Sequence, residues 1–260
     1  MADWQIIDSH CHLDFPVFDT KRQQLVKSAR QAGVSHIVIP AVTYQGFQRV
    51  IDTASAYPHL SFALGLHPCF MQEHQSSDLE KLAECIETCP VCAVGEIGLD
   101  FYIADYDAAA QLSLLKAQLK IAKEHQLPVL LHVRKAHDIM LKTLREMRFE
   151  QGGIVHAFSG SAQQAGHYIK MGFALGFGGV VTYPRSNKIR SLAKTLPLGS
   201  IVLETDSPDM PLYGRQGEPN QPLRVVDVLK EVAVLRPEPI EVIAAITTAN
   251  VMRLLKLQAV

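Results

Sequence analysis

The sequence predicts a single (β/α)8 barrel, and three observations support this fold class. Eight short runs rich in Val, Ile, Leu and Phe recur along the 260 residues, and a longer amphipathic or Ala/Leu/Lys-rich stretch follows each of them. The runs are nearly continuous in apolar residues, which is typical of parallel strands covered by helices. No Gly/Ser linker or change in composition divides the chain. We therefore expect one domain over residues 1–260, and a doubly wound open sheet is the alternative.

The elements follow one another as strand and helix along the whole chain. The strands are expected at 5–10, 35–41, 61–66, 91–97, 128–133, 153–157, 172–178 and 200–206. The helices are expected at 20–33, 43–57, 76–88, 105–125, 135–148, 161–171, 186–196, 222–235 and 239–256. The last of these is one helix more than eight units require, so the barrel carries an extra C-terminal helix.

Two Gly-containing segments, one after the eighth strand and one in the seventh strand, need separate interpretation. Residues 207–222, SPDMPLYGRQGEPNQP, are rich in Pro and Gly and follow the eighth strand, so we expect a lid or rim at the active face. Residues 172–180, GFALGFGGV, lack the Gly-Lys-Ser/Thr ending of a phosphate-binding loop. Close backbone packing in the seventh strand explains these glycines better.

The composition indicates a globular protein that does not coat nucleic acid. Apolar residues make up 48% and charged residues 20%, and the formal net charge is −1. That charge does not suit stable, sequence-independent binding to a duplex, although few and local contacts with DNA stay possible. No apolar run reaches the roughly 20 residues that span a bilayer, and the N-terminus lacks a secretory pattern. We expect a cytoplasmic monomer without a membrane or protein partner.

The five cysteines do not indicate a disulfide framework. Cys85, Cys89 and Cys92 lie close together in the sequence, but they fall on a predicted helix end and a predicted strand. No fourth soft ligand is near, so we interpret them as small buried residues rather than as a zinc site.

Side chains that bind metals or transfer protons gather at the ends of the predicted strands. In a (β/α)8 barrel the carboxyl ends of the strands meet at one mouth, where catalytic residues lie. Five strands end in such residues, and the candidates are His10, His12, Glu96, His132, His156 and Asp206. His10 and His12 are two residues apart, so both can point into the mouth while Cys11 turns toward the helices.

Four imidazoles and two carboxylates in one cavity predict a site for divalent metals. A single histidine in an apolar strand is more often a hydrogen-bonded core residue, but carboxylates such as Glu96 and Asp206 are rarely buried without a metal or a partner. Six ligands exceed what one tetrahedral ion needs, so we expect two ions. A pair of ions suits hydrolysis, and Glu96 is the best candidate for a carboxylate that spans both.

Other residues near the mouth have two interpretations each. Asp8 either fixes the tautomer of a ligand histidine or is a buried aspartate bonded to the backbone. His67, in the motif GLHP, either contacts an anionic substrate and protonates a leaving group or stabilises the turn before Pro68. The basic residues that either hold phosphate oxygens or are solvated surface charges are Arg134, Lys135, Arg185 and Arg215.

Seven ordered motifs resemble those of the TatD-type metal-dependent deoxyribonucleases. They are IDSHCHLD, GLHP, VGEIGLDFY, LPVLLHVRKAHD, IVHAFSG, GFGGVVTYP and LETDSP, and they are spread over most of the chain. The resemblance implies an amidohydrolase-like TIM barrel, two divalent cations and hydrolysis of phosphodiester bonds in DNA.

The resemblance also implies a role for each of the six candidate ligands. His10 and His12 would bind the first ion, and His132 and His156 would bind the second. Glu96 would bridge the two ions. Asp206 would return to the first ion while it orients or deprotonates the attacking water.

The leading hypothesis is a hydrolase that trims single-stranded or frayed DNA ends with Zn, Mg or Mn, with His67, Arg134 and Arg215 contacting the substrate. A small-molecule amidohydrolase or lactonase is the alternative. Such barrels often bridge their metals through a modified lysine at the end of the fourth strand, where this sequence has Glu96. A binding module that uses the metals for structure is a third possibility.

Overall fold

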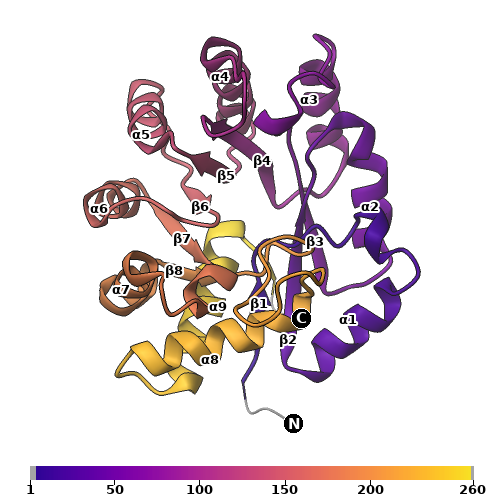
Figure 1. Ribbon diagram of the computed structural model, residues 1–260. Helices are drawn as coiled ribbons and strands as arrows, with labels where there is room; N and C mark the ends of the chain where they lie inside the picture. Colours follow the sequence, from indigo (N-terminus) through magenta and orange to yellow (C-terminus); the bar gives the residue numbers. More distant parts are fainter. Residues whose placement is uncertain (1–3, 259–260) are drawn as a thin grey trace.

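A computed structural model describes residues 4–258, which form an eight-stranded parallel barrel surrounded by helices (Figure 1). The strands are β1 (Ile6–Asp8), β2 (Val34–Pro40), β3 (Leu60–Leu64), β4 (Ala93–Asp100), β5 (Val129–Arg134), β6 (Gly153–Val155), β7 (Phe173–Phe177) and β8 (Ile201–Leu203). Each strand pairs with the next one in the sequence, so the order in the sheet is β1 to β8. The predicted barrel is therefore confirmed.

The first and last strands meet, which excludes the open sheet. The backbone N–H of Ser9 donates to the carbonyl of Leu203 at 3.0 Å, and the N–H of Asp206 donates to the carbonyl of His10 at 2.8 Å. A parallel bridge joins Cys11 to Ser207. The segments that follow β1 and β8 therefore lie side by side at the mouth of the barrel.

All nine predicted helices are present among residues 4–258. They are α1 (Arg22–Gln31), α2 (Phe47–Ser55), α3 (Asp78–Thr88), α4 (Ala108–Glu124), α5 (His137–Glu146), α6 (Ala162–Lys170), α7 (Asn187–Thr195), α8 (Val225–Leu235) and α9 (Ile240–Leu255). Within the same range, no helix is both long and apolar enough to cross a bilayer.

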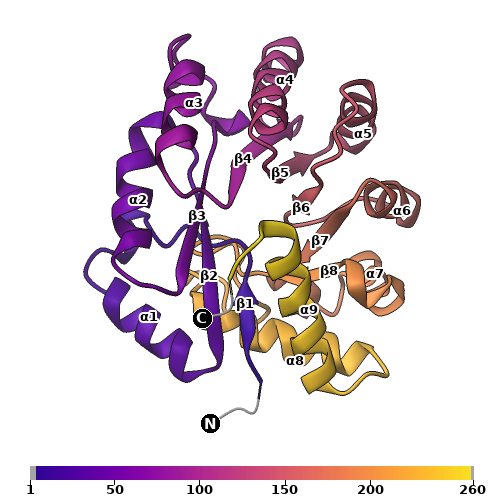
Figure 2. The ribbon, with the colours of Figure 1, turned by 180° about the vertical axis from the view of Figure 1, so that it is seen from behind.

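Two layers of apolar side chains hold the barrel together. The larger layer lies between the strands and the surrounding helices, and Cys11 belongs to it, as its predicted orientation requires. The smaller layer takes one residue from every strand, together with Cys92 just before β4, and packs them against Val251, Leu254 and Leu255 of α9. The extra C-terminal helix thus covers the end of the barrel opposite the mouth, as the rear view shows (Figure 2).

The fourth strand differs from the prediction of 91–97, because β4 continues to Asp100. Glu96 therefore lies within the strand and not at its end, which corrects the prediction. The extension depends on Gly98, which pairs with His132 of β5. A Cβ atom on Gly98 would lie 1.9 Å from the carbonyl oxygen of His132, so any side chain there would separate the two strands.

The loop 207–222 forms part of the rim of the mouth. Its anchor is Asn220, which is buried and donates from Nδ2 to the carbonyl of Thr205 at 2.9 Å and to that of Met210 at 3.2 Å. Gly179 permits the close approach of this loop, because a Cβ atom there would lie 2.2 Å from the Met210 oxygen. The segment that the sequence suggested as a lid or rim is thus fixed against β7 and β8.

Candidate metal centre

The carboxylate of Glu96 is 2% exposed and lies at the centre of five imidazoles. Its Oε2 is 3.2 Å from Nε2 of His10 and 3.5 Å from Nε2 of His12. Its Oε1 is 3.2 Å from Nδ1 of His132, 2.8 Å from Nε2 of His156 and 3.1 Å from Nε2 of His67. Two carboxylate oxygens cannot hydrogen-bond well to five ring nitrogens, so this arrangement favours an additional positive charge between them.

His10 and His12 follow β1 and present Nε2 to the carboxylate of Asp206 from the other side. The distances to its Oδ1 are 3.7 Å and 3.6 Å. The Nδ1 of His12 donates to the carbonyl of Pro40 at 3.2 Å, which leaves the lone pair on Nε2. His10 Nδ1 is buried and has no hydrogen-bond partner among the described residues. A hydrogen bond at Nδ1 thus directs the Nε2 lone pair of His12 into the site, whereas Nε2 of His10 lies within hydrogen-bond distance of Glu96.

Asp100 orients His132 and was missed at the sequence level. Its Oδ2 accepts a hydrogen bond from His132 Nε2 at 2.9 Å, and its Oδ1 accepts one from the Tyr102 N–H at 2.8 Å. Burial raises the pKa of Asp100, but the bonds from His132 and Tyr102 outweigh this effect and lower the pKa to about 2. The proton of a neutral His132 is thus held at Nε2, and Nδ1 faces the centre of the site.

Glu204 supports the segment that carries His156 and was also missed. It follows β8, is fully buried, and accepts a hydrogen bond from the Ala157 N–H at 2.5 Å. Its Oε1 lies 3.9 Å from Nδ1 of His156. Gly176 makes room for it, because a Cβ atom there would lie 2.1 Å from Oε2. This side-chain contact is one reason for the glycine-rich seventh strand, and the predicted close approach of backbone occurs at Gly179.

His67 uses both ring nitrogens within the protein. Its Nδ1 accepts a hydrogen bond from the Cys69 N–H at 3.1 Å, so the proton of the neutral ring lies on Nε2 and is donated to Glu96. The turn-stabilising interpretation is therefore correct as far as Nδ1 is concerned. A contact between the substrate and His67 would require Nε2 to leave Glu96.

Asp8 does not bind any imidazole. Its carboxylate accepts hydrogen bonds from the backbone N–H and the hydroxyl of Thr205, at 2.9 Å and 2.6 Å. The hypothesis that Asp8 fixes a ligand tautomer is wrong, because its position one layer below the histidines places it against the segment after β8.

The pKa values of the site indicate which side chains are neutral and which are charged at neutral pH. Burial lowers the pKa of His10 to about 3 and that of His12 to about 4, so both rings are neutral at pH 7. Burial would raise the pKa of Glu96, but the surrounding histidines, His67 and His156 foremost, lower it well below its usual value. Burial raises the pKa of Asp206 to about 7. Neutral imidazoles beside an ionised carboxylate form a set of ligands ready for a metal.

His156 differs from the other histidines. Burial lowers its pKa, but the nearby charge of Glu96 and the hydrogen bond with it outweigh this effect and raise the pKa to about 10. Without a metal the ring is therefore a cation that compensates the carboxylates. A divalent metal would replace this proton, so metal binding is expected to release it.

Among residues 4–258, three groups of side chains bring ligand atoms within 4.8 Å of one another. Two of them share His10 and contain five of the six predicted ligands: His10, Glu96 and His156 in one, and His10, His12 and Asp206 in the other. The third combines His67, Cys69 and His132. Burial raises the pKa of the Cys69 thiol to about 12, which makes it a poor ligand at neutral pH. The cysteines at 85, 89 and 92 belong to none of these three groups.

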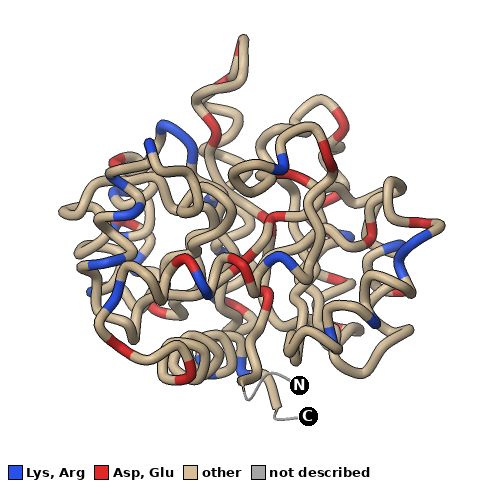
Figure 3. The backbone as a smooth tube through the Cα atoms, turned by 60° about the horizontal axis from the view of Figure 1, so that its bottom comes forward, with Lys and Arg blue, Asp and Glu red and all other residues tan. Residues whose placement is uncertain are grey.

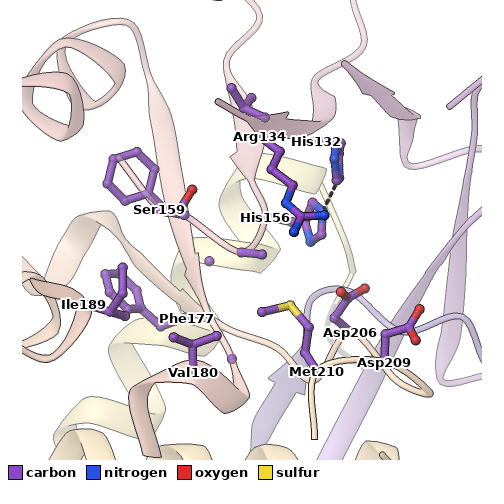
Figure 4. A pocket seen from close by; sticks show the side chains of 15 residues that line it. His132, Arg134, His156, Ser159, Phe177, Val180, Ile189, Asp206, Asp209 and Met210 are labelled. Atoms are coloured by element: carbon purple, nitrogen blue, oxygen red, sulfur yellow. Dashed lines mark hydrogen bonds between the residues drawn. The ribbon is translucent and has the colours of Figure 1, made fainter. Parts of the chain in front are cut away.

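A cavity of about 420 Å³ opens beside the centre (Figure 4). His132, His156 and Asp206 line it on one side, and Arg134 contributes to its wall. The guanidinium of Arg134 lies 3.8 Å from the centre of the exposed Tyr102 ring.

The other basic candidates lie outside this cavity. Lys135, Arg185 and Arg215 are exposed and are not among its lining residues. Arg215 lines a separate small pocket with Glu218 and Arg224. The structure therefore brings only Arg134 of these residues to the metal centre.

Comparison with known proteins shows the family to which the chain is similar. The profile of the family described as TatD related DNase matches residues 7–256. The chain is 45% identical over 242 residues to YjjV of Escherichia coli strain K12, which is described as an uncharacterized metal-dependent hydrolase; the match covers 92% of this chain and 93% of YjjV. It is 32% identical to YabD of Bacillus subtilis strain 168, with the same description, over 97% of this chain and 99% of YabD.

Solved structures agree with the fold. The crystal structure of YjjV, a TatD homolog from E. coli K12, superposes with a TM-score of 0.95 at 43% identity and covers 97% of this chain and 98% of that chain. A TatD family hydrolase from Entamoeba histolytica superposes with a TM-score of 0.85 at 20% identity, over 98% of this chain and 99% of that chain. The second likeness concerns the barrel alone.

Proposed function

Because the chain belongs to the TatD related DNase family of metal-dependent hydrolases, we propose that its substrate is DNA and that it cleaves phosphodiester bonds at single-stranded or frayed ends. The observation that carries this proposal is that the two oxygens of the Glu96 carboxylate face different histidines. One oxygen faces His10 and His12, and the other faces His132 and His156. A carboxylate that joins two sets of ligands in this way suits a bridge between two cations.

Five of the six candidate residues would divide into two ligand sets, with Glu96 between them. His10, His12 and Asp206 would hold one cation, and His132 and His156 would hold the other. Divalent cations held by these residues would supply Lewis acidity for the hydrolysis of a phosphodiester. Nitrogen and carboxylate ligands together suit Zn or Mn well, and Mg in part.

The surrounding residues would act on protons and on orientation. Asp206 lines the cavity, where its carboxylate would orient an attacking water or accept a proton from it. His67 donates its Nε2 proton to Glu96 and would keep that carboxylate ionised and in place. Arg134, held against Tyr102, would pair with a phosphate oxygen at the cavity wall.

The charge distribution favours a local contact with DNA over an extended one. Lys and Arg are dispersed among Asp and Glu along the tube in Figure 3, and the net charge is −1. A protein that follows a long stretch of duplex needs a continuous basic surface. Trimming of ends requires only a few phosphate contacts at the mouth.

The test is cleavage of a labelled single-stranded oligonucleotide in the presence of Mg²⁺, Mn²⁺ or Zn²⁺. We expect the oligonucleotide to be shortened, and we expect Glu96→Ala to abolish this activity. Glu87→Ala, at an exposed position of α3, is the matched control and should behave as the wild type. Activity that survives Glu96→Ala would come from a contaminating nuclease and would remove the support for the proposal.

A second candidate function is hydrolysis of a small amide or lactone, and the apolar part of the cavity wall favours it. Val133, Phe158 and Phe177 would accept an acyl group as well as a base. A panel of amides and lactones, assayed beside the oligonucleotide, separates the two functions. Turnover of the panel without cleavage of DNA would establish the second. Two equivalents of metal by mass spectrometry with no turnover of either would indicate a binding module.

A further inference from the structure

The cavity beside the metal centre has two chemically different halves. His132, His156 and Asp206 form the polar half. The opposite half consists of apolar side chains from four separate segments: Phe177 at the end of β7, Val180 in the turn after it, Ile189 on α7 and Met210 on the rim loop (Figure 4). A substrate that fills this space therefore carries an apolar group next to the bond that is cleaved.

The apolar half is preformed and in contact with solvent. Val180, Ile189 and Met210 are only half-buried, whereas Phe177 is buried beneath them. Apolar surface held open to water in this way gains free energy when a ligand covers it. The rim loop cannot fill the space, because its backbone is anchored through Asn220 and packs against Gly179.

The size of the cavity restricts its occupant. A volume of about 420 Å³ lies at the lower end of the range for small-molecule sites, which is roughly 300–1,000 Å³. It suits one planar group and not a segment of duplex. Three polar side chains at its edge, Arg134, Ser159 and Asp209, can meet the polar edge of such a group.

We propose that this cavity receives a single unstacked nucleobase, from the nucleotide adjacent to the phosphodiester that is cleaved. The inference rests on the proposed function and specifies its substrate. A base offers an apolar face to Phe177 and Val180 and polar atoms at its rim, which matches both kinds of lining. A paired base cannot enter, so an end must fray or the base must leave the stack before cleavage.

The test compares oligonucleotides with and without the base. Two single strands carry an abasic tetrahydrofuran residue at the 3′ or the 5′ end, and a third of the same length has all its bases. Stacking of one base corresponds to an effect of about fivefold to 150-fold. We expect the wild type to cleave one of the abasic strands with a kcat/KM at least fivefold below that of the full strand.

A variant that fills the cavity locates the effect. Val180→Trp should lower cleavage of the full strand about tenfold and leave cleavage of that abasic strand within twofold. Val234→Trp, the same change at a position on α8 that is 77% exposed, should leave both unchanged. If Val180→Trp does not fold, inhibition of the wild type tests the proposal instead. The inhibition constant of dAMP should be at least tenfold below that of deoxyribose 5-phosphate.

Different results would overturn the two proposals separately. The base pocket is refuted if the wild type cleaves all three strands equally, or if dAMP and deoxyribose 5-phosphate inhibit it equally. Cleavage of DNA would still stand in either case. An equal loss on full and abasic strands in a folded Val180→Trp would refute it as well. If no strand is cleaved while an amide or lactone is, both proposals fail, and the cavity holds an acyl group.

Discussion

Asp100 and His132 face each other across the strand pair β4 and β5, and a hydrogen bond of 2.9 Å joins Oδ2 to Nε2. Because the carboxylate can only accept, this bond fixes the proton on Nε2 and directs the Nδ1 lone pair at Glu96. The position of Asp100 thus decides which nitrogen of His132 is offered to a metal.

Replacement of Asp100 should weaken metal binding. Loss of such a partner typically costs 10- to 100-fold in metal affinity, so we expect a reduction of this size in Asp100→Ala and a smaller one in Asp100→Asn. The measurement is activity as a function of metal concentration, together with metal content after dialysis. Asp52→Ala, at an exposed position on α2, is the control. Unchanged metal affinity in a folded Asp100→Ala would show that His132 needs no such orientation.

Removal of metal should lower the thermal stability of the wild type. Metal present at 100 times its dissociation constant stabilises the folded state by about 2.7 kcal/mol, which for this chain length corresponds to roughly 5–10 °C in Tm. We expect chelation to lower the Tm by this amount in the wild type and by much less in Glu96→Ala. Calorimetry before and after chelation gives the result, and a wild-type Tm that does not respond would contradict a metal centre.

Gly176→Ala should disturb Glu204 and through it His156. The added Cβ would lie 2.1 Å from Glu204 Oε2, so the carboxylate must move and the bond to the Ala157 N–H must change. Overpacking of this kind costs about 1–3 kcal/mol. A shift of His156 should lower activity at least tenfold.

The matched control for this change is Gly166→Ala. A Cβ atom at Gly166, within α6, meets no atom within 4 Å, so alanine should stabilise the helix by about 0.5–1 kcal/mol. Urea unfolding and the oligonucleotide assay are applied to both variants. If the two variants lose stability and activity alike, the contact with Glu204 is not the cause.

His36 should make the protein sensitive to acid. Burial, with smaller effects from His59 and Arg30, lowers its pKa from 6.5 to about 4, and its Nε2 bonds to Ser61 Oγ at 2.8 Å. The unfolded chain binds a proton between these two values and the folded chain does not. Protonation of His36 in the unfolded chain therefore lowers the free energy of unfolding as the pH falls from 6.5 toward 4, by about 2 kcal/mol at pH 5.

The variant His36→Gln isolates this effect. The difference in unfolding free energy between variant and wild type should shift in favour of the variant by about 2 kcal/mol between pH 7.5 and pH 5. Urea unfolding at the two pH values, with the metal concentration held constant, measures it. A difference that is the same at both values would mean that His36 titrates normally in the folded protein.

The sequence was sufficient for the barrel and for the residues that meet at its mouth. Apolar runs of the length of a strand and helices with clear end signals are local features, so all eight strands and nine helices could be predicted. The convergence of His10 and Asp206 followed from the geometry of a parallel barrel, in which strand ends meet, whereas Glu96 reaches the same site from within β4. These predictions needed no knowledge of long-range contacts.

Asp100 and Glu204 were missed although a signal was present. Each shares the strand periodicity of a predicted ligand, since Asp100 lies four residues after Glu96 and Glu204 lies two residues before Asp206. The extent of β4 could not be predicted, because it depends on the contact between Gly98 and β5. The role of Asp8 depends on its partner Thr205, 197 residues away.

The packing of α9 against the strands determines where substrate enters the barrel and where product leaves it. The end of the barrel opposite the mouth is closed by three side chains of α9, Val251, Leu254 and Leu255. The barrel is therefore open at one end only. A substrate must therefore enter, and its product leave, through the mouth of the barrel, past Arg134 and the rim loop. Bound product has to leave this opening before the next substrate can enter.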